Sequence, residues 1–113
     1  MWPPSGWRRE AAEQLRNSVL KGAVLDVVIN GGHLVCLSNG PVLLMRAEEN
    51  CVLFGFWGGQ RLREIEPLLK PGRKYEMATR EFHEDDEANT SVASRLAKEA
   101  MRLNKVLGDP TKF

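Results

Sequence analysis

The chain has 113 residues, with 16 Lys and Arg residues against 15 Asp and Glu residues. A single domain, residues 1–113, accounts for this length and can bury a core without the help of a metal or a disulfide. The net charge of +1 argues against a protein that binds nucleic acid through bulk positive charge, and the 42% of hydrophobic residues argues against a disordered chain.

The first predicted element is a helix that ends at Gly22. Ser5 is placed to cap its amino terminus, because a hydroxyl can accept a hydrogen bond from a free amide of the first turn. Hydrophobic side chains recur every four residues along one face, at Trp7, Ala11, Leu15 and Val19. This spacing is typical of a helix that packs one face on a core.

Four short strands are predicted next, over residues 23–29, 34–37, 42–45 and 51–57. The first is rich in β-branched residues and is followed by Asn30-Gly31-Gly32, a strong signal for a tight turn. A second turn signal follows the second strand, and a polar segment separates the third strand from the fourth. Parallel neighbours need a connection of a dozen or more residues, so these strands are expected to form an antiparallel meander.

The segment after the fourth strand contains two breaks and one more strand. Gly58-Gly59 interrupts the fourth strand, and residues 60–69 have the apolar spacing of a short helix or turn. After Pro71-Gly72, residues 73–80 alternate in polarity. This alternation predicts a fifth strand with one face exposed to solvent and with Tyr75, Met77 and Thr79 on the other.

The last predicted element is the longest helix, which follows an acidic segment at residues 81–87. Its hydrophobic stripe has steps of four and three and comprises Val92, Leu96, Ala100, Leu103 and Leu107. Four basic residues lie off this stripe, at Arg95, Lys98, Arg102 and Lys105. Gly108 and Pro110 are expected to end the helix.

The order of these elements predicts an α+β domain. We expect a two-layer α-β(5)-α sandwich, in which the two terminal helices cover one face of an antiparallel meander sheet. A meander of this kind has two edge strands, and an edge strand can pair across the axis of a homodimer. A homodimer through a sheet edge is therefore one expected form of self-association.

The acidic segment is the first candidate for a functional site. If the fifth strand continues to residue 85, Glu81, His83 and Asp85 project from one face, and these ligand types suit a divalent iron-like metal. The structural alternative needs no metal. The acids from Glu84 to Glu87 precede a long helix, where negative charge complements the helix dipole and caps free amides. We favour this alternative, because it requires no special geometry.

An aromatic residue and a basic cluster form the second candidate site. Trp57 ends the fourth strand, and Arg73, Lys74 and Tyr75 begin the fifth. If the two strand ends share a cleft, an aromatic ring and cations there would hold a small anion or an acidic peptide. The structural alternative, which we favour, is a solvated basic edge. The surrounding segment 61–80 carries six Lys and Arg residues against three acids, which predicts a local positive patch.

The two cysteines, Cys36 and Cys51, are too few for a disulfide framework and indicate a reducing compartment. Both have apolar neighbours, so buried side chains without chemistry are the favoured interpretation. His33 is interpreted as a polar residue at a hairpin edge, and it faces away from Cys36 in an extended strand. An approach of His33 to Cys51 from a neighbouring strand stays open.

Three stretches of the chain carry a combined pattern: CVLFGFWGGQRL at residues 51–62, PLLKPGRKY at 67–75 and AKEAMRLN at 97–104. They contain an apolar strand that runs into a glycine turn, a Leu-Leu loop ahead of a lysine, and a helix with Glu-Ala-x-x-Leu-Asn. In these motifs, about residues 23–107 of the chain resemble the YdhG-like bacterial domain family of unknown function. The resemblance implies a frataxin-like α-β(5)-α sandwich.

The same resemblance implies two sets of site residues. Some family members are described as frataxin-like intracellular iron chaperones, which implies iron binding by exposed carboxylates. The carboxylates of this chain that could serve that role, and that a test would address, are Glu81, Glu84, Asp85, Asp86 and Glu87. The glycine turn and the lysine loop of the family correspond to Trp57, Gly58 and Lys74, which would line a pocket if the two segments form one.

No apolar stretch has the length of a signal peptide or of a membrane span, so we expect a cytoplasmic protein that does not contact membranes. We also expect it to be a binding protein that is not an enzyme and does not contact nucleic acid. The preferred hypothesis places a small anion or a protein partner, without a cofactor, at a cleft of Trp57, Gly58, Arg73, Lys74 and Tyr75. The alternative is iron binding and delivery by Glu81, His83, Glu84, Asp85 and Asp86. A cysteine- or metal-dependent enzyme ranks third, because its necessary groups do not converge at any readable spacing.

Overall fold

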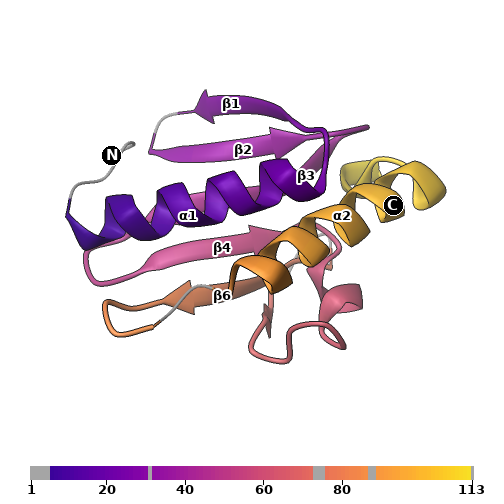
Figure 1. Ribbon diagram of the computed structural model, residues 1–113. Helices are drawn as coiled ribbons and strands as arrows, with labels where there is room; N and C mark the ends of the chain where they lie inside the picture. Colours follow the sequence, from indigo (N-terminus) through magenta and orange to yellow (C-terminus); the bar gives the residue numbers. More distant parts are fainter. Residues whose placement is uncertain (1–5, 31, 73–75, 87–88, 113) are drawn as a thin grey trace.

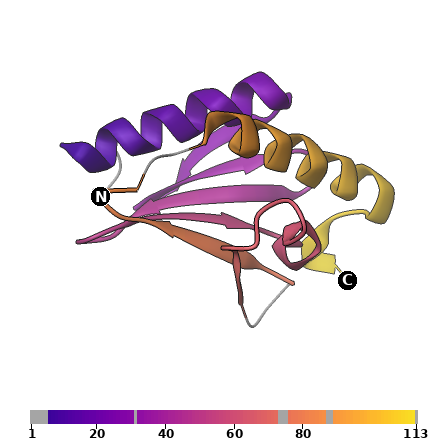
Figure 2. The ribbon, with the colours of Figure 1, turned by 60° about the horizontal axis from the view of Figure 1, so that its bottom comes forward.

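The structure is a computed structural model that describes residues 6–30, 32–72, 76–86 and 89–112. Its α-helices are α1 (Trp7–Gly22) and α2 (Thr90–Leu107), and both lie over the same face of one antiparallel sheet (Figures 1 and 2). The expected two-layer α+β sandwich is confirmed. Within the described ranges, neither helix combines the length and the hydrophobicity that a membrane span requires.

The sheet has six strands in the described residues, one more than expected. They are β1 (Asp26–Asn30), β2 (His33–Leu37), β3 (Pro41–Ala47), β4 (Val52–Phe56), β5 (Lys70–Pro71) and β6 (Ala78–Phe82). Their order is β1-β2-β3-β4-β6-β5, and every neighbouring pair is antiparallel. The first four strands form the expected meander, and β1 and β5 are the two edges.

The predicted strand over residues 73–80 is wrong in its bounds. Residues 73–75 lie outside the described part of the chain, and Glu76 has a left-handed backbone with a φ of 53°. A left-handed residue cannot belong to a regular strand, so β6 begins only at Ala78. Its pairing with the two-residue strand β5, which the sequence did not suggest, places Lys70 opposite Thr79.

The predicted face of this strand is also wrong. Ala78 and Phe82 are buried, with exposed fractions of 0% and 3%, whereas Thr79 lies on the face away from the helices. The alternation of polarity over residues 73–80 predicted that Thr79 lies on the buried face. That prediction is wrong because the alternation included residues that do not belong to β6. β6 then pairs with β4, with Phe82 opposite Val52.

The core lies between the helices and the sheet. Its strand residues alternate along β2, β3 and β4, as expected for a sheet covered on one face, and include Leu34, Cys36, Leu43, Met45, Val52, Phe54 and Phe56. The rings of Phe54 and Phe56 meet edge to face, with centroids 4.8 Å apart. Burial of each such side chain stabilises the fold by roughly 1.5–3 kcal/mol.

The amino-terminal helix starts one residue later than a Ser5 cap predicts. The N-cap residue of α1 is Gly6, which makes no side-chain hydrogen bond, and Ser5 lies outside the described residues. At the other end, Gly22 closes the helix as expected. A Cβ atom on Gly22 would overlap the backbone oxygen of Ser94 in α2, so glycine permits the close crossing of the two helices.

The start of α2 is capped by an amide side chain and not by the acidic segment. The Asn89 side chain accepts a hydrogen bond from the backbone N–H of Val92 at 3.1 Å, and the first turn contains no acidic residue. The prediction that the acids from Glu84 onward cap this helix is therefore wrong for the described residues; Glu87 lies outside them. Gly108, with a φ of 91°, ends the helix as predicted.

A buried asparagine fixes the carboxyl-terminal half of α2 to the sheet. Asn104 is 3% exposed, and its Nδ2 donates to the carbonyl oxygens of Ser38 and Pro41, each at 3.0 Å. The Asn39 side chain donates in return to the Asn104 carbonyl oxygen at 2.7 Å. These bonds clamp the turn between β2 and β3 and set the position of the exposed face of α2.

Candidate functional site

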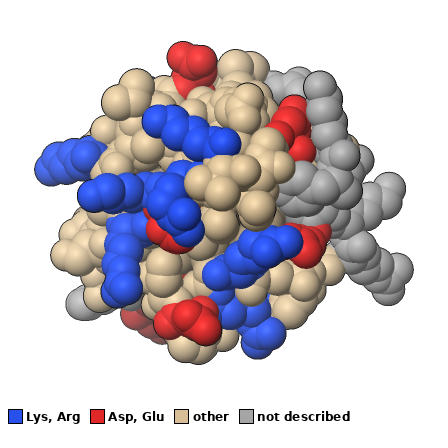
Figure 3. Space-filling model, turned by 90° about the vertical axis from the view of Figure 1, so that its right-hand side faces the viewer, with Lys and Arg blue, Asp and Glu red and all other residues tan. Residues whose placement is uncertain are grey.

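An open groove of about 680 Å³ lies between α2 and the segment that follows β4. The helix contributes one wall, with Arg95, Lys98, Glu99, Met101, Arg102 and Lys105. Arg61, Glu64 and Ile65 form the other wall. Five of these residues are basic and two are acidic, so the lining has a net charge of +3. Lys and Arg side chains gather on this side of the molecule (Figure 3), and we call the feature the basic groove.

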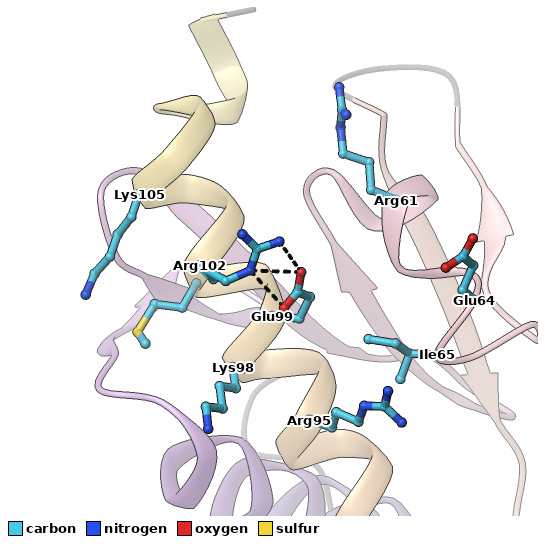
Figure 4. A pocket seen from close by; sticks show the side chains of 9 residues that line it. Arg61, Glu64, Ile65, Arg95, Lys98, Glu99, Arg102 and Lys105 are labelled. Atoms are coloured by element: carbon cyan, nitrogen blue, oxygen red, sulfur yellow. Dashed lines mark hydrogen bonds and ion pairs between the residues drawn. The ribbon is translucent and has the colours of Figure 1, made fainter.

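The helix wall owes its charge to the spacing of its basic residues. Arg95 and Arg102 are seven residues apart, and so are Lys98 and Lys105, with steps of three and four between neighbours. Residues at these steps share a helix face, so the four cations follow about 15 Å of α2. In Figure 4 Arg95 points toward Ile65 of the opposite wall, while the side chains of Lys98 and Lys105 extend away from that wall.

Two glycines position the second wall. Gly58 has a left-handed φ of 70° and leads into η1 (Gly59–Leu62), a short 3-10 helix. A Cβ atom on Gly59 would lie 2.9 Å from the backbone nitrogen of Ala78, so the missing side chain lets η1 pack closely on β6. Leu62 anchors the segment in the core, with an exposed fraction of 0%. Arg61 and Ile65 are thereby held opposite α2 (Figure 4).

Carboxylates hold two of the guanidinium groups in place. The Nε of Arg102 donates to both carboxylate oxygens of Glu99 at 3.0 Å. This hydrogen bond, aided by the positive charge, lowers the pKa of Glu99, and the same contact raises the pKa of Arg102. On the other wall, the Nε of Arg61 donates to the Glu76 carboxylate at 2.8 Å. Both guanidinium groups are therefore oriented before any ligand arrives.

The remaining cations of the basic groove are not neutralised in this way. Arg95, Lys98 and Lys105 form no ion pair with any carboxylate in the described part of the chain. The negative charge of Glu99 is already engaged by Arg102. The basic groove therefore keeps uncompensated positive charge, which favours anionic ligands.

The predicted cleft of Trp57, Gly58, Arg73, Lys74 and Tyr75 falls largely outside the described structure. Trp57 is half-buried, and its backbone N–H donates to the Val42 carbonyl oxygen at 3.1 Å. Gly58 is buried at the turn into η1. Residues 73–75 lie outside the described ranges, so a cleft between Trp57 and Lys74 stays a prediction.

The positive patch predicted over residues 61–80 is divided in the structure. Arg61 lines the basic groove, whereas Arg80 is directed inward and forms an ion pair with Glu66 at 3.2 Å. The side chains of Arg80 and Glu66 are only 17% and 12% exposed. Arg80 therefore supports the fold and is not available to a ligand.

The acidic segment forms a turn and not a continued strand. β6 ends at Phe82 and does not continue to residue 85, so the condition under which Glu81, His83 and Asp85 would share one strand face is not met. The backbone N–H of His83 donates to the Asp86 carboxylate at 2.8 Å, and the Asp86 N–H donates to the His83 carbonyl at 3.0 Å. The hydrogen bond from the His83 amide is the main cause of a lowered pKa at Asp86.

The turn at residues 83–86 brings few metal-ligating side chains together. The His83 ring lies 3.3 Å from the Asp86 carboxylate through Nδ1 and 3.8 Å from the Glu81 carboxylate through Nε2. Glu84 and Asp85 are exposed and join neither contact. Among the residues that the structure describes, no group of three or more His, Cys, Asp or Glu side chains converges to hold a metal ion. Iron binding by this segment stays a prediction.

The cysteines lie in environments that suppress thiolate chemistry. Cys36 is fully buried, and burial raises its pKa to about 11. The pKa of the Cys51 thiol is also raised, by burial first and then by the charges of Glu81 and Glu48. Reactive cysteines need a lowered pKa. His33 lies opposite Arg46 of β3, and the charges that act on the Cys51 thiol are those of Glu81 and Glu48. Among the described residues, the geometry therefore gives no support to a Cys51–His33 nucleophile pair.

The sequence contains one feature that indicates the basic groove, namely the spacing of the basic residues in the last helix. The sequence pattern places Arg95, Lys98, Arg102 and Lys105 off the apolar stripe of the last helix and does not by itself assign them to a groove. Their repeated seven-residue spacing marks a continuous basic face. The other wall had no comparable signal, because Arg61 reaches α2 only through the turn at Gly58.

Comparison with known proteins adds no relative. A scan of protein-family models, a search of curated proteins and a search of solved structures each find no match to this chain. The resemblance to the YdhG-like family therefore stays a prediction. The fold and the basic groove rest on the structure itself.

Proposed function

We propose that this protein is a non-catalytic binding module whose basic groove receives a ligand with several carboxylate or phosphate groups. The observation that carries the proposal is that three arginines, Arg61, Arg95 and Arg102, line one open groove of net positive charge. A guanidinium group is planar and donates two parallel hydrogen bonds, which match the oxygen pairs of a carboxylate or a phosphate.

The three arginines have different roles in this proposal. Arg102 and Arg61 are oriented by Glu99 and Glu76, so less conformational entropy is lost when they bind a ligand. Arg95 forms no ion pair with the described carboxylates, although its charge contributes to the lowered pKa of Glu99, and with Lys98 and Lys105 it supplies the excess positive charge. It is the residue on which affinity depends most.

The exposure of the groove determines the type of ligand. An exposed ion pair contributes only about 0.2–1 kcal/mol, so one carboxylate or phosphate would be held weakly. A ligand with several anionic groups can engage both walls at once. Ile65 and Met101 in the lining offer apolar contact to the carbon skeleton of such a ligand.

The proposal is tested by nuclear magnetic resonance titration with citrate and with tripolyphosphate, and with acetate as the singly charged control. We expect amide shifts concentrated in residues 61–65 and 95–105, for the multiply charged ligands and not for acetate. Binding should weaken as salt is raised, because the groove is open to solvent. Arg95→Ala should weaken binding by about tenfold or more, the equivalent of one lost charge-assisted hydrogen bond.

A matched control is Arg16→Ala, which removes an exposed arginine from α1, outside the basic groove. It should leave the affinity unchanged. Equal losses for Arg16→Ala and Arg95→Ala would show that only net charge matters and would contradict the proposal. Shifts spread over the whole surface, or no shifts at all, would contradict it as well. Circular dichroism of both variants verifies that they are folded.

A further inference from the structure

The two edges of the sheet differ in their protection against pairing. β5 has only two residues, Lys70 and Pro71. Proline has no N–H to donate, and short, lysine-bearing edge strands are a common defence against the addition of another strand. β1 has five residues and contains neither lysine nor proline. Only the β1 edge is therefore long enough, and free enough of such residues, to accept a further strand.

The surface at the β1 edge is also apolar. Val28 and Ile29 of β1 are 47% and 60% exposed, and Val24, two residues before the strand, is 90% exposed. These three are half of the six large hydrophobic residues that are exposed in the described part of the chain. Within that part, β2 is the one strand that pairs with β1. Among the described residues, the outer edge of β1 thus combines backbone groups without a strand partner with exposed aliphatic side chains.

We infer that β1 pairs with β1 of a second copy of this chain, antiparallel about a two-fold axis at Val28. A two-fold axis brings the same strand of both copies together in antiparallel orientation. With the axis at Val28, all five residues of β1 overlap all five of its copy. Shifted registers leave strand residues at both ends without a partner.

The residues of β1 are compatible with this register. Val28 lies opposite Val28 of the second copy, and Val27 lies opposite Ile29 of the second copy. Aliphatic residues are therefore paired with aliphatic residues on both faces of the sheet. The single charged residue of β1, Asp26, lies two residues from the axis, so it does not face its own copy. No like charges meet. The backbone N–H and C=O groups that point away from β2 gain partners across the axis. The inference does not depend on the basic groove.

Sedimentation velocity over a range of concentrations tests the dimer. We expect a reversible monomer–dimer equilibrium for the natural chain. Val28→Lys should weaken the dimer by about tenfold or more, because it places two ammonium groups directly opposite each other. Leu68→Lys is the matched control, since it adds the same charge at a residue that is 61% exposed and lies two positions before β5. It should leave the dimer unchanged.

Cysteine cross-linking tests the register independently of Val28→Lys. Val28→Cys should form a disulfide-linked dimer under mild oxidation, since opposite Cα atoms in an antiparallel pair are about 4.5–5.5 Å apart. Asp26→Cys should not, because its copy lies four residues away along the strand, about 13 Å. The natural chain controls for linkage through Cys51. A chain that stays monomeric at the highest concentration, or a dimer that Asp26→Cys links and Val28→Cys does not, would overturn the inference.

Discussion

Arg80 and Glu66 form an ion pair that is almost completely enclosed. The Nη1 of Arg80 lies 3.2 Å from the Oε1 of Glu66, and the side chains are only 17% and 12% exposed. The guanidinium carbon also lies 4.2 Å from the centre of the Phe82 ring. Because Glu66 directly follows Ile65, this pair ties one wall of the basic groove to β6. The stability of the groove is therefore coupled to the stability of the pair.

Removal of one partner of this pair should be costly. Glu66→Ala leaves the Arg80 charge enclosed without this partner, so we expect the free energy of unfolding to fall by about 3 kcal/mol. Chemical denaturation with urea, which does not screen charges, measures this change. The double variant Glu66→Leu with Arg80→Met should recover most of this loss, because it removes both charges and keeps the volume filled. A loss of about 0.5 kcal/mol or less for Glu66→Ala would instead indicate a solvent-screened pair.

Loss of the clamp at the end of α2 should also destabilise the fold. Asn104→Ala removes the donor to the carbonyl oxygens of Ser38 and Pro41, which are then left without this partner. We expect the free energy of unfolding to fall by about 2–3 kcal/mol. Asn17→Ala, at an exposed position of α1, is the control and should change it by less than about 0.5 kcal/mol. Similar values for the two variants would show that the clamp does not contribute.

The turn after β6 should make stability depend on pH in the acid range. Folding lowers the pKa of Asp86 below 3.8, because its carboxylate accepts a hydrogen bond from the His83 amide. The stabilisation is therefore present above about pH 4 and is lost as the pH falls through the lower, folded-state pKa. Thermal unfolding between about pH 5 and pH 2 should show a smaller pH dependence for Asp86→Asn than for the natural chain.

The neighbouring variant Asp85→Asn is the control for this titration, because Asp85 is exposed and accepts no hydrogen bond among the described residues. It should retain the pH dependence of the natural chain. The same pH dependence in Asp86→Asn and in the natural chain would show that the turn does not stabilise the ionised carboxylate.

The two thiols should be poor nucleophiles and should differ in accessibility. Cys36 is fully buried with a pKa of about 11, so we expect iodoacetamide to label it only after unfolding. Cys51 is partly exposed, and its pKa is also raised, so it should react first but slowly at pH 8. Mass spectrometry of timed samples measures both rates. Fast labelling of Cys51 near pH 6 would reveal an activated thiol and would contradict this account.

The elements with local signals were predictable from the sequence. The hydrophobic stripe of α2 and the stop at Gly108 identified the last helix, and the turn signals between the first four strands identified the meander. The position of β6 was not predictable, because it depends on the left-handed Glu76 and on pairing with Lys70 and Pro71. Both are consequences of tertiary structure and leave no periodic pattern.

The candidate site was predictable only in part. A basic contribution from the segment 61–80 was expected, and Arg61 supplies it. The larger contribution comes from α2, where Arg95 and Arg102 belong to a helix that the sequence indicated mainly as a core element. Arg80, which the sequence counted with the positive patch, is paired with Glu66 inside the molecule. Charge counts along the chain do not distinguish such enclosed cations from exposed ones.

The unequal edges of the sheet also limit the size of any assembly. Pairing through β1 consumes the one long edge that the described strands leave open, and the outer strand on each far side is then β5. Pro71 offers no N–H there, so further copies cannot be added strand by strand. A dimer formed through β1 would therefore be a closed pair with symmetric ends, and not a growing fibre. Pro71 in the edge strand β5 thus disfavours the addition of further copies to such a dimer.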